Sequence, residues 1–162
     1  MWSVPRNLSR SYPAVPGSVV EARRAVSEFA AASGADRDQV EAVRLACSEA
    51  LTNAVLHAYR GVPGPGEVHV TAASVSDQLR VLIADDGCGL EPNADRPGLG
   101  FGLALITQLS DSVTIVSRAS GGTEVRMRFS LVTAESAGEP EAGGTCLAGH
   151  ECGSVASASS PA

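Results

Sequence analysis

The clearest pattern of hydrophobic and polar positions lies between residues 123 and 131, where every second side chain is apolar and the others are mainly arginine or serine. This two-residue period is typical of a β-strand with one buried and one solvated face. Shorter β-type runs lie at 8–14, 68–75, 78–85 and 112–117. A sheet with one solvated face requires helices on its other face only, which predicts two layers.

Helix signals fill the segment between the first two predicted strands. Ser18 is followed three residues later by Glu21, the signature of a capping box. A helix is therefore predicted from Ser18 to Ser33, where Gly34 stops it.

The same signature recurs at Asp36 and Gln39, and predicts a second helix that continues to the glycine- and proline-rich loop at 61–66. A third helix is predicted at about 102–110. The element order, β-α-α-β-β-α-β-β, predicts an α/β (α+β) two-layer sandwich. Its sheet should be mixed and mostly antiparallel, with the helices on one face.

One folded domain fits the length of 162 residues. We expect it to span residues 8–132, after a flexible N-terminus at 1–7. Residues 133–162 are rich in alanine, glycine, serine and glutamate and offer little apolar surface to bury, so they are predicted to be a disordered tail. Cys146, His150 and Cys152 in this tail lack the number and spacing of ligands in a zinc site.

Charge narrows the classes of function. The formal net charge is -6 and no basic block offsets it, which argues against nucleic acid or an anionic membrane as a partner. No run approaches the roughly 20 apolar residues of a membrane span, so a cytoplasmic protein is expected. All 12 basic residues are arginine. The absence of lysine excludes a P-loop, the protein-kinase-fold lysine and Schiff-base chemistry, so any phosphate must be bound by backbone N–H groups, arginine, histidine or a metal.

Three polar residues, Glu49, Asn53 and His57, recur at every fourth position in an otherwise apolar part of the second predicted helix. Side chains four residues apart lie above one another on a helix, so these three form a polar stripe apart from the solvent-facing side. An ordinary solvated face explains an isolated pair of this kind equally well. The polar stripe therefore gains its meaning from the motifs that accompany it.

Three further motifs follow the polar stripe. Asp85, Gly87 and Gly89 form a D-x-G-x-G pattern where a predicted strand ends. A glycine-rich run, GLGFG at 98–102, opens the third predicted helix, and Thr123 follows two glycines at the turn into the last strand. Taken alone, each motif is typical of an ordinary turn or connector, and the glycine run lacks the spacing of the dinucleotide fingerprint.

Together, the order, spacing and element context of these motifs resemble the GHKL ATPases, the superfamily of gyrase, the Hsp90 chaperones, histidine kinases and MutL, which share the Bergerat ATP-binding fold. The polar stripe is similar to the N box of that family, the D-x-G-x-G pattern to its first glycine box, GLGFG to its second, and Thr123 to the threonine that closes the pocket. The resemblance spans roughly residues 8–131. Within the superfamily, SEALTNAVLHAY at 48–59 is most similar to the anti-sigma-factor serine kinases of bacterial partner-switching systems.

The resemblance implies that ATP and Mg²⁺ are bound. The Asp85 carboxylate would accept a hydrogen bond from the adenine amine, and Gly87 and Gly89 would let the backbone approach the base. The triphosphate would lie against backbone N–H groups at the start of the third helix, where the helix dipole favours negative charge. The nucleotide-binding residues implied there are Gly98, Leu99, Gly100, Phe101 and Gly102, with Thr123 closing the pocket.

The polar stripe would supply the remaining groups. The amide oxygen of Asn53 would be the protein's metal ligand, because Mg²⁺ prefers oxygen and keeps waters and phosphates as its other ligands. Glu49 would be the catalytic residue that polarises the attacking hydroxyl. His57 would contact phosphate, as would Arg96 in the short segment before the glycine run.

One function is favoured over two others. The resemblance implies an ATP-dependent protein serine/threonine kinase that phosphorylates a STAS-type anti-anti-sigma factor, sequesters a sigma factor and forms a homodimer. The alternative is an ATP-loaded protein-binding regulator without kinase activity, which would not require a carboxylate at Glu49. The ATP-binding half of a histidine kinase fits less well, since no helical segment before residue 18 is predicted to carry a phospho-accepting histidine.

Overall fold

The computed structural model describes residues 7–57, 64, 66–88 and 99–131. Its helices and strands are β1 (Asn7–Pro13), α1 (Pro16–Ala32), α2 (Arg37–His57), β2 (Glu67–Val75), β3 (Gln78–Asp85), α3 (Leu99–Leu109), β4 (Ser112–Ser117) and β5 (Thr123–Ser130). This order is the one predicted from the hydrophobic pattern. The bounds differ most at α3, which begins at Leu99 and therefore includes most of the glycine-rich run.

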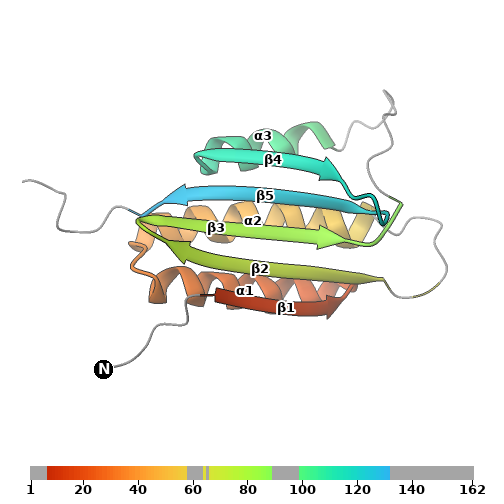
Figure 1. The fold of residues 1–162 in the computed structure, drawn as a ribbon, viewed down its shortest axis with the longest axis horizontal. Helices are drawn as coiled ribbons and strands as arrows, with labels where there is room; N and C mark the ends of the chain where they lie inside the picture. Colours follow the sequence, from red (N-terminus) through yellow and green to blue (C-terminus); the bar gives the residue numbers. More distant parts are fainter. Residues whose placement is uncertain (1–6, 58–63, 65, 89–98, 132–162) are drawn as a thin grey trace, which may run out of the picture.

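The strands form one five-stranded sheet in the order β1-β2-β3-β5-β4. Each neighbouring pair is antiparallel, so the prediction of a mostly antiparallel sheet is confirmed, and the described strands contain no parallel pair. This strand order arises because the connection from β3 through α3 places β4 one strand beyond the position next to β3. β5 then returns between β3 and β4, which point in the same direction without pairing (Figure 1).

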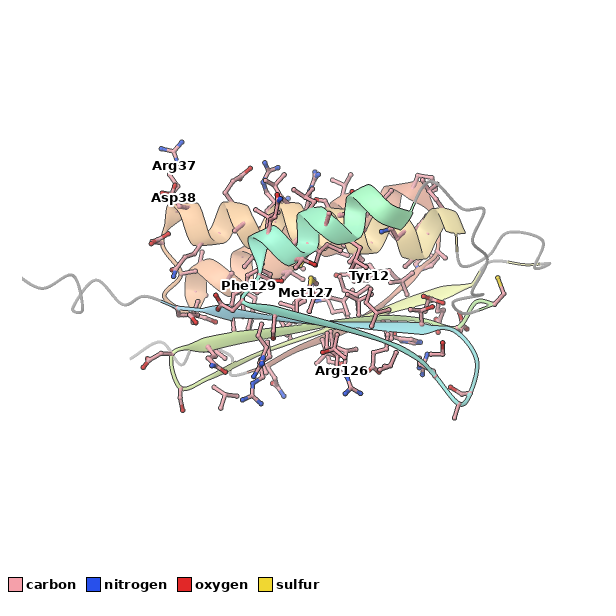
Figure 2. All side chains as sticks on the ribbon, turned by 90° about the horizontal axis from the view of Figure 1, so that it is seen from above. Tyr12, Arg37, Asp38, Arg126, Met127 and Phe129 are labelled. Carbon is pink, nitrogen blue, oxygen red and sulfur yellow. The ribbon has the colours of Figure 1, made fainter. Side chains whose placement is uncertain are left out.

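All three helices lie on one face of the sheet, which confirms the two-layer sandwich (Figure 2). Figure 2 shows Tyr12, Met127 and Phe129 between the sheet and the helices, whereas Arg126 extends from the opposite face. Met127 and Phe129 are only 1% and 5% exposed. Burial of a side chain of this size contributes about 1.5–3 kcal/mol, so the alternation along β5 determines which face the helices cover. Within the described ranges, no helix has the length and apolarity needed to cross a membrane.

α1 begins before the predicted capping box. Pro16 is its first residue, Val15 takes the N-cap position in an extended conformation, and no side chain caps this end. The expectation that Ser18 caps the helix is wrong, because Ser18 is a buried residue inside the first turn. Proline explains the earlier start, since its fixed φ suits the first helical position and it has no N–H that would need a cap.

The second capping signature is confirmed at the start of α2. The Asp36 N–H donates to Gln39 Oε1 over 2.9 Å, and the Gln39 N–H donates to Asp36 Oδ1 over 2.8 Å. This reciprocal pair fixes where α2 begins. Gln39 Nε2 also donates to the carbonyl of Ser130 at 2.9 Å, which joins the start of α2 to the end of β5.

The segments that carry the predicted motifs meet at one end of the molecule. Figure 1 shows the C-terminal end of α2, the end of β3, the start of α3 and the turn between β4 and β5 at that end. The end of β3 and the β4–β5 turn lie close together because β3 pairs with β5 and β5 pairs with β4. The fold therefore brings together residues that are up to about 75 positions apart in the chain.

Candidate functional site

Asp85, the last residue of β3, is a buried acid at this end of the sheet. It is 5% exposed, and among the described residues only Ser18 is another buried polar residue. Its Oδ1 accepts hydrogen bonds from the backbone N–H groups of Gly87 at 3.0 Å and Thr123 at 3.2 Å. In the described part of the chain, both of these donors bond the same oxygen of the carboxylate.

The surroundings of Asp85 change its acidity. Burial is the largest effect and raises the pKa of the carboxyl above its ordinary value. The N–H groups of Gly87 and Thr123 act in the opposite direction, because they stabilise the charged form. Smaller effects come from Asp86, which raises the pKa, and from Arg118, which lowers it. A buried carboxyl whose pKa is shifted by burial is a candidate functional group.

The β4–β5 turn (residues 118–122) packs directly against the end of β3. Gly122 has φ +87°, and a Cβ atom at this position would lie 2.7 Å from the carbonyl carbon of Asp85 and 2.9 Å from Cα of Asp86. Only glycine combines this left-handed conformation with so close an approach. The turn places the N–H of Thr123 on the Asp85 carboxylate, so the contact of Thr123 with the acid is made by its backbone.

Arg118 is a residue of the candidate site that no sequence motif indicates. Its Nη1 donates to the backbone carbonyl oxygen of Asp85 at 2.8 Å, across 33 positions of the chain. The only signal in the sequence is an arginine directly after a predicted strand and before two glycines, a pattern that is common at exposed turns. The contact depends on the pairing of β3 with β5, which brings the β4–β5 turn to the end of β3.

The polar stripe of α2 meets the glycine-rich run of α3. Glu49 and Asn53 are half-buried. A Cβ atom at Gly102 would overlap the Glu49 carboxylate and lie 2.7 Å from its Cδ. A glycine at 102 therefore makes room for Glu49 against α3, and this contact joins two of the predicted motifs in space.

Several predicted site residues fall outside this geometry. His57, Leu99, Gly100 and Phe101 belong to α2 and α3, and only their helical backbone is described. Gly89, Arg96 and Gly98 lie outside the described residues, as do Cys146, His150 and Cys152. Their roles remain predictions.

The described part of the chain contains no group of three or more His, Cys, Asp or Glu side chains that could hold a metal ion. A magnesium ion does not require such a group, because it is commonly held by one or two protein oxygens together with phosphates and water. The half-buried amide of Asn53, one turn beyond Glu49 on the same helix, fits that pattern.

Curated proteins similar to this chain are named as an anti-sigma factor and as a serine-protein kinase. The chain is 27% identical over 137 residues to the anti-sigma F factor of Oceanobacillus iheyensis, covering 76% of this chain and 92% of that protein. It is 33% identical over 131 residues to the serine-protein kinase RsbW of Bacillus pumilus, covering 71% of this chain and 80% of that protein.

Solved structures agree in fold. The chain matches the structure of the RsbU and RsbW domains of Rv1364c from Mycobacterium tuberculosis with a TM-score of 0.63 and 26% identity. The match covers 78% of this chain but 33% of that longer one. The histidine kinase domain of the Erythrobacter litoralis blue-light activated histidine kinase EL346 matches with a TM-score of 0.51 and 26% identity over 68% of this chain and 61% of that one.

A family model also matches most of the chain. The model of the histidine kinase-like ATPase domain covers residues 12–129, a range that includes all three helices and extends from the end of β1 almost to the end of β5. The resemblance to GHKL proteins found in the sequence is thereby confirmed. The chain belongs to the histidine kinase-like ATPase domain family.

Proposed function

We propose that this protein binds ATP with Mg²⁺, transfers the γ-phosphate to a serine or threonine of a STAS-type anti-anti-sigma factor, and sequesters a sigma factor. The ATPase family to which the chain belongs supports nucleotide binding. Relatives named anti-sigma F factor and serine-protein kinase RsbW support the two protein partners.

The observation that carries nucleotide binding is the Asp85 carboxylate. Asp85 is buried, and among the described residues two backbone N–H groups bond its Oδ1 while none is seen to donate to Oδ2. The exocyclic amine of adenine is a donor that matches such an acceptor, whereas guanine presents a carbonyl oxygen at the equivalent position. Because the backbone donors bond Oδ1, the proton of the neutral acid would lie on Oδ2, and ionisation makes Oδ2 a pure acceptor. The backbone donors that oppose the raised pKa of Asp85 therefore favour the form that would accept the amine.

The phosphates would lie at the start of α3. The chain has no lysine, so charge must be compensated by backbone N–H groups, arginine, histidine and the metal. The first turn of a helix provides free N–H groups and the positive end of the dipole. The glycines of this run would allow phosphate oxygens to approach the backbone. Asn53 would contribute an amide oxygen to Mg²⁺, which in turn would neutralise phosphate charge.

Glu49 would act in the transfer step. The hydroxyl oxygen of the substrate serine forms a bond to the γ-phosphorus, the bond from that phosphorus to the β,γ-bridging oxygen breaks, and ADP leaves with that oxygen. The hydroxyl proton passes to the Glu49 carboxylate, so charge and atoms balance. Contact with Gly102 holds this carboxylate beside the start of α3, where the phosphates are proposed to lie.

Substitution of Glu49 tests the transfer step. We expect Glu49→Gln to bind ATP with Mg²⁺ as the unmodified protein does, but to lose at least about 100-fold in transfer of labelled γ-phosphate to a STAS-type protein encoded beside this one. Glu41→Gln, on the exposed side of the same helix, is the matched control and should transfer normally. Unchanged transfer by Glu49→Gln would remove Glu49 from the role of base.

The second candidate function is an ATP-loaded regulator that binds partners without phosphorylating them. The half-buried position of Glu49 favours the kinase, because a binding protein gains nothing from a carboxylate close to the proposed phosphates. ATP binding by the unmodified protein without any labelled product would favour the binding protein instead.

A further inference from the structure

The β4–β5 turn and the residue after it bond two groups of Asp85, its side-chain carboxylate and its backbone carbonyl. Beyond the turn, the Thr123 N–H donates to the carboxylate of Asp85, while at its start Arg118 Nη1 donates to the backbone carbonyl of the same residue. The turn itself is closed by two backbone hydrogen bonds of 3.0 Å, from the Arg118 N–H to the carbonyl of Gly122 and from the Gly121 N–H to the carbonyl of Arg118. Arg118 therefore belongs both to the turn and to the contact with β3.

The contact of Arg118 is specific. Its guanidinium is partly buried and bonds a neutral backbone carbonyl, and among the described residues it forms no ion pair with a carboxylate. A hydrogen bond from a charged donor is stronger than one between neutral groups. The other described contacts of the turn with Asp85 use backbone atoms of the turn, since Gly122 packs against the Asp85 backbone and Thr123 donates its N–H. Of the turn's contacts with Asp85, the hydrogen bond from Arg118 is thus the one that a substitution in the turn can remove.

Asp85 is paired with Val68 of β2 on one side of β3, whereas on the side of β5 its position depends on the Arg118 contact. Asp85 is the last residue of β3, and the register of β3 with β5 ends one residue earlier, at Ala84 opposite Glu124. Beyond that pair, the Arg118 bond and the bond from Thr123 replace the ladder between these two strands. Loss of the guanidinium would free the carbonyl of Asp85 and loosen the adjacent N–H contact with its carboxylate.

We propose that Arg118 is a positioning residue for nucleotide recognition, which holds the end of β3 against the β4–β5 turn so that the Asp85 carboxylate is presented to the base in one orientation. The proposal rests on the proposed function, because it takes Asp85 to be the group that contacts adenine. Arg118 itself would not touch the nucleotide. Its contribution would be expressed as affinity for ATP and as preference for adenine over guanine.

Calorimetric titration with ATP and with GTP, each with Mg²⁺, tests this role. We expect Arg118→Ala to weaken ATP binding roughly tenfold, the equivalent of one charge-assisted hydrogen bond, and to bring the ATP and GTP affinities closer together. Arg118→Lys retains a charged donor and should recover most of the difference. Arg126→Ala, which removes an exposed arginine from the uncovered face of the sheet, is the matched control and should bind as the unmodified protein does.

The ratio of the two affinities separates positioning from a general loss of structure, because partial unfolding lowers both affinities by the same factor. Arg118→Ala with an unchanged ATP-to-GTP ratio would overturn the proposal, and so would unchanged ATP affinity. If Arg118→Ala does not fold, Arg118→Gln provides the same comparison with a shorter, neutral side chain. Absence of ATP binding by the unmodified protein would instead contradict the proposed function.

Discussion

The end of β3 and the polar stripe of α2 carry the two acids of the candidate site in contrasting surroundings. Asp85 is buried, receives two backbone hydrogen bonds on one oxygen and is backed by the β4–β5 turn. Glu49 is half-buried and lies against a glycine of α3. A group that recognises a flat base benefits from a fixed position, whereas a group that accepts a proton from a partner protein must stay accessible. We infer that the fold separates recognition from transfer.

The largest expected effect of a substitution is on stability, at the β4–β5 turn. Gly122→Ala combines a left-handed φ with overlap of the Asp85 backbone, and should lower the free energy of unfolding by about 3 kcal/mol or more. Gly34 also has a left-handed φ, but a Cβ atom at this position would meet nothing within 4 Å. Gly34→Ala should therefore lower the free energy of unfolding only by the backbone strain, about 1–2 kcal/mol. Urea denaturation measures both, and equal losses would mean that the turn does not pack tightly against β3.

Asp85→Asn should separate binding from stability. Asparagine retains an acceptor for the Gly87 and Thr123 N–H groups, but its amide nitrogen is a donor that opposes the adenine amine. We expect ATP affinity to fall by roughly 100-fold, because a donor faces a donor in a buried site, while the melting temperature does not fall. Asp86→Asn, at the exposed neighbouring acid, is the control and should bind ATP normally. Normal titration of Asp85→Asn would contradict the assignment of the base site.

Gly102→Ala should act on the other acid. The added Cβ would displace the Glu49 carboxylate, which is the flexible end of its side chain, and we expect phosphate transfer to fall about 10- to 100-fold. Stability should change little, because overpacking costs roughly 1–3 kcal/mol while alanine in place of helical glycine recovers about 1 kcal/mol. Gly17→Ala in α1, where a Cβ meets nothing within 4 Å, is the matched control. A transfer assay with normal rates for Gly102→Ala would show that Glu49 does not depend on this contact.

The smallest expected effect is on the pH dependence of stability. The pKa of Asp85 is raised in the folded protein, so the folded state keeps a proton at a pH where the unfolded chain has lost it. The stabilisation contributed by this group is complete below the unfolded pKa of about 3.9 and declines as the pH rises through the folded value. The free energy of unfolding of the unmodified protein, relative to Asp85→Asn, should therefore decrease over that interval. An increase with pH would reverse the sign of the shift.

Much of the fold was predictable because local signals and tertiary packing agree. The alternation along β5 and the capping pair of Asp36 and Gln39 both have the structure that their spacing predicts. The capping signature at Ser18 gives the wrong helix start, because Pro16 begins α1 without a side-chain cap. At both helix starts the outcome depended on residues within one turn of each other.

The candidate site was predictable to a lesser degree. Asp85 and Gly102 were identified through motifs, and the structure adds what each of them touches. Arg118 and the close approach of Gly122 were not predictable, because they depend on the pairing of β3 with β5 across more than 30 positions. No local pattern encodes such a contact, since the hydrogen bond partner is a backbone carbonyl that every residue possesses.

A crystal structure of the protein with a non-hydrolysable ATP analogue and Mg²⁺ tests the central claim most directly. The account predicts that the exocyclic amine of adenine lies about 3 Å from Asp85 Oδ2, with the bonds from Gly87 and Thr123 to Oδ1 retained. An analogue bound with its purine away from the end of β3 would contradict it.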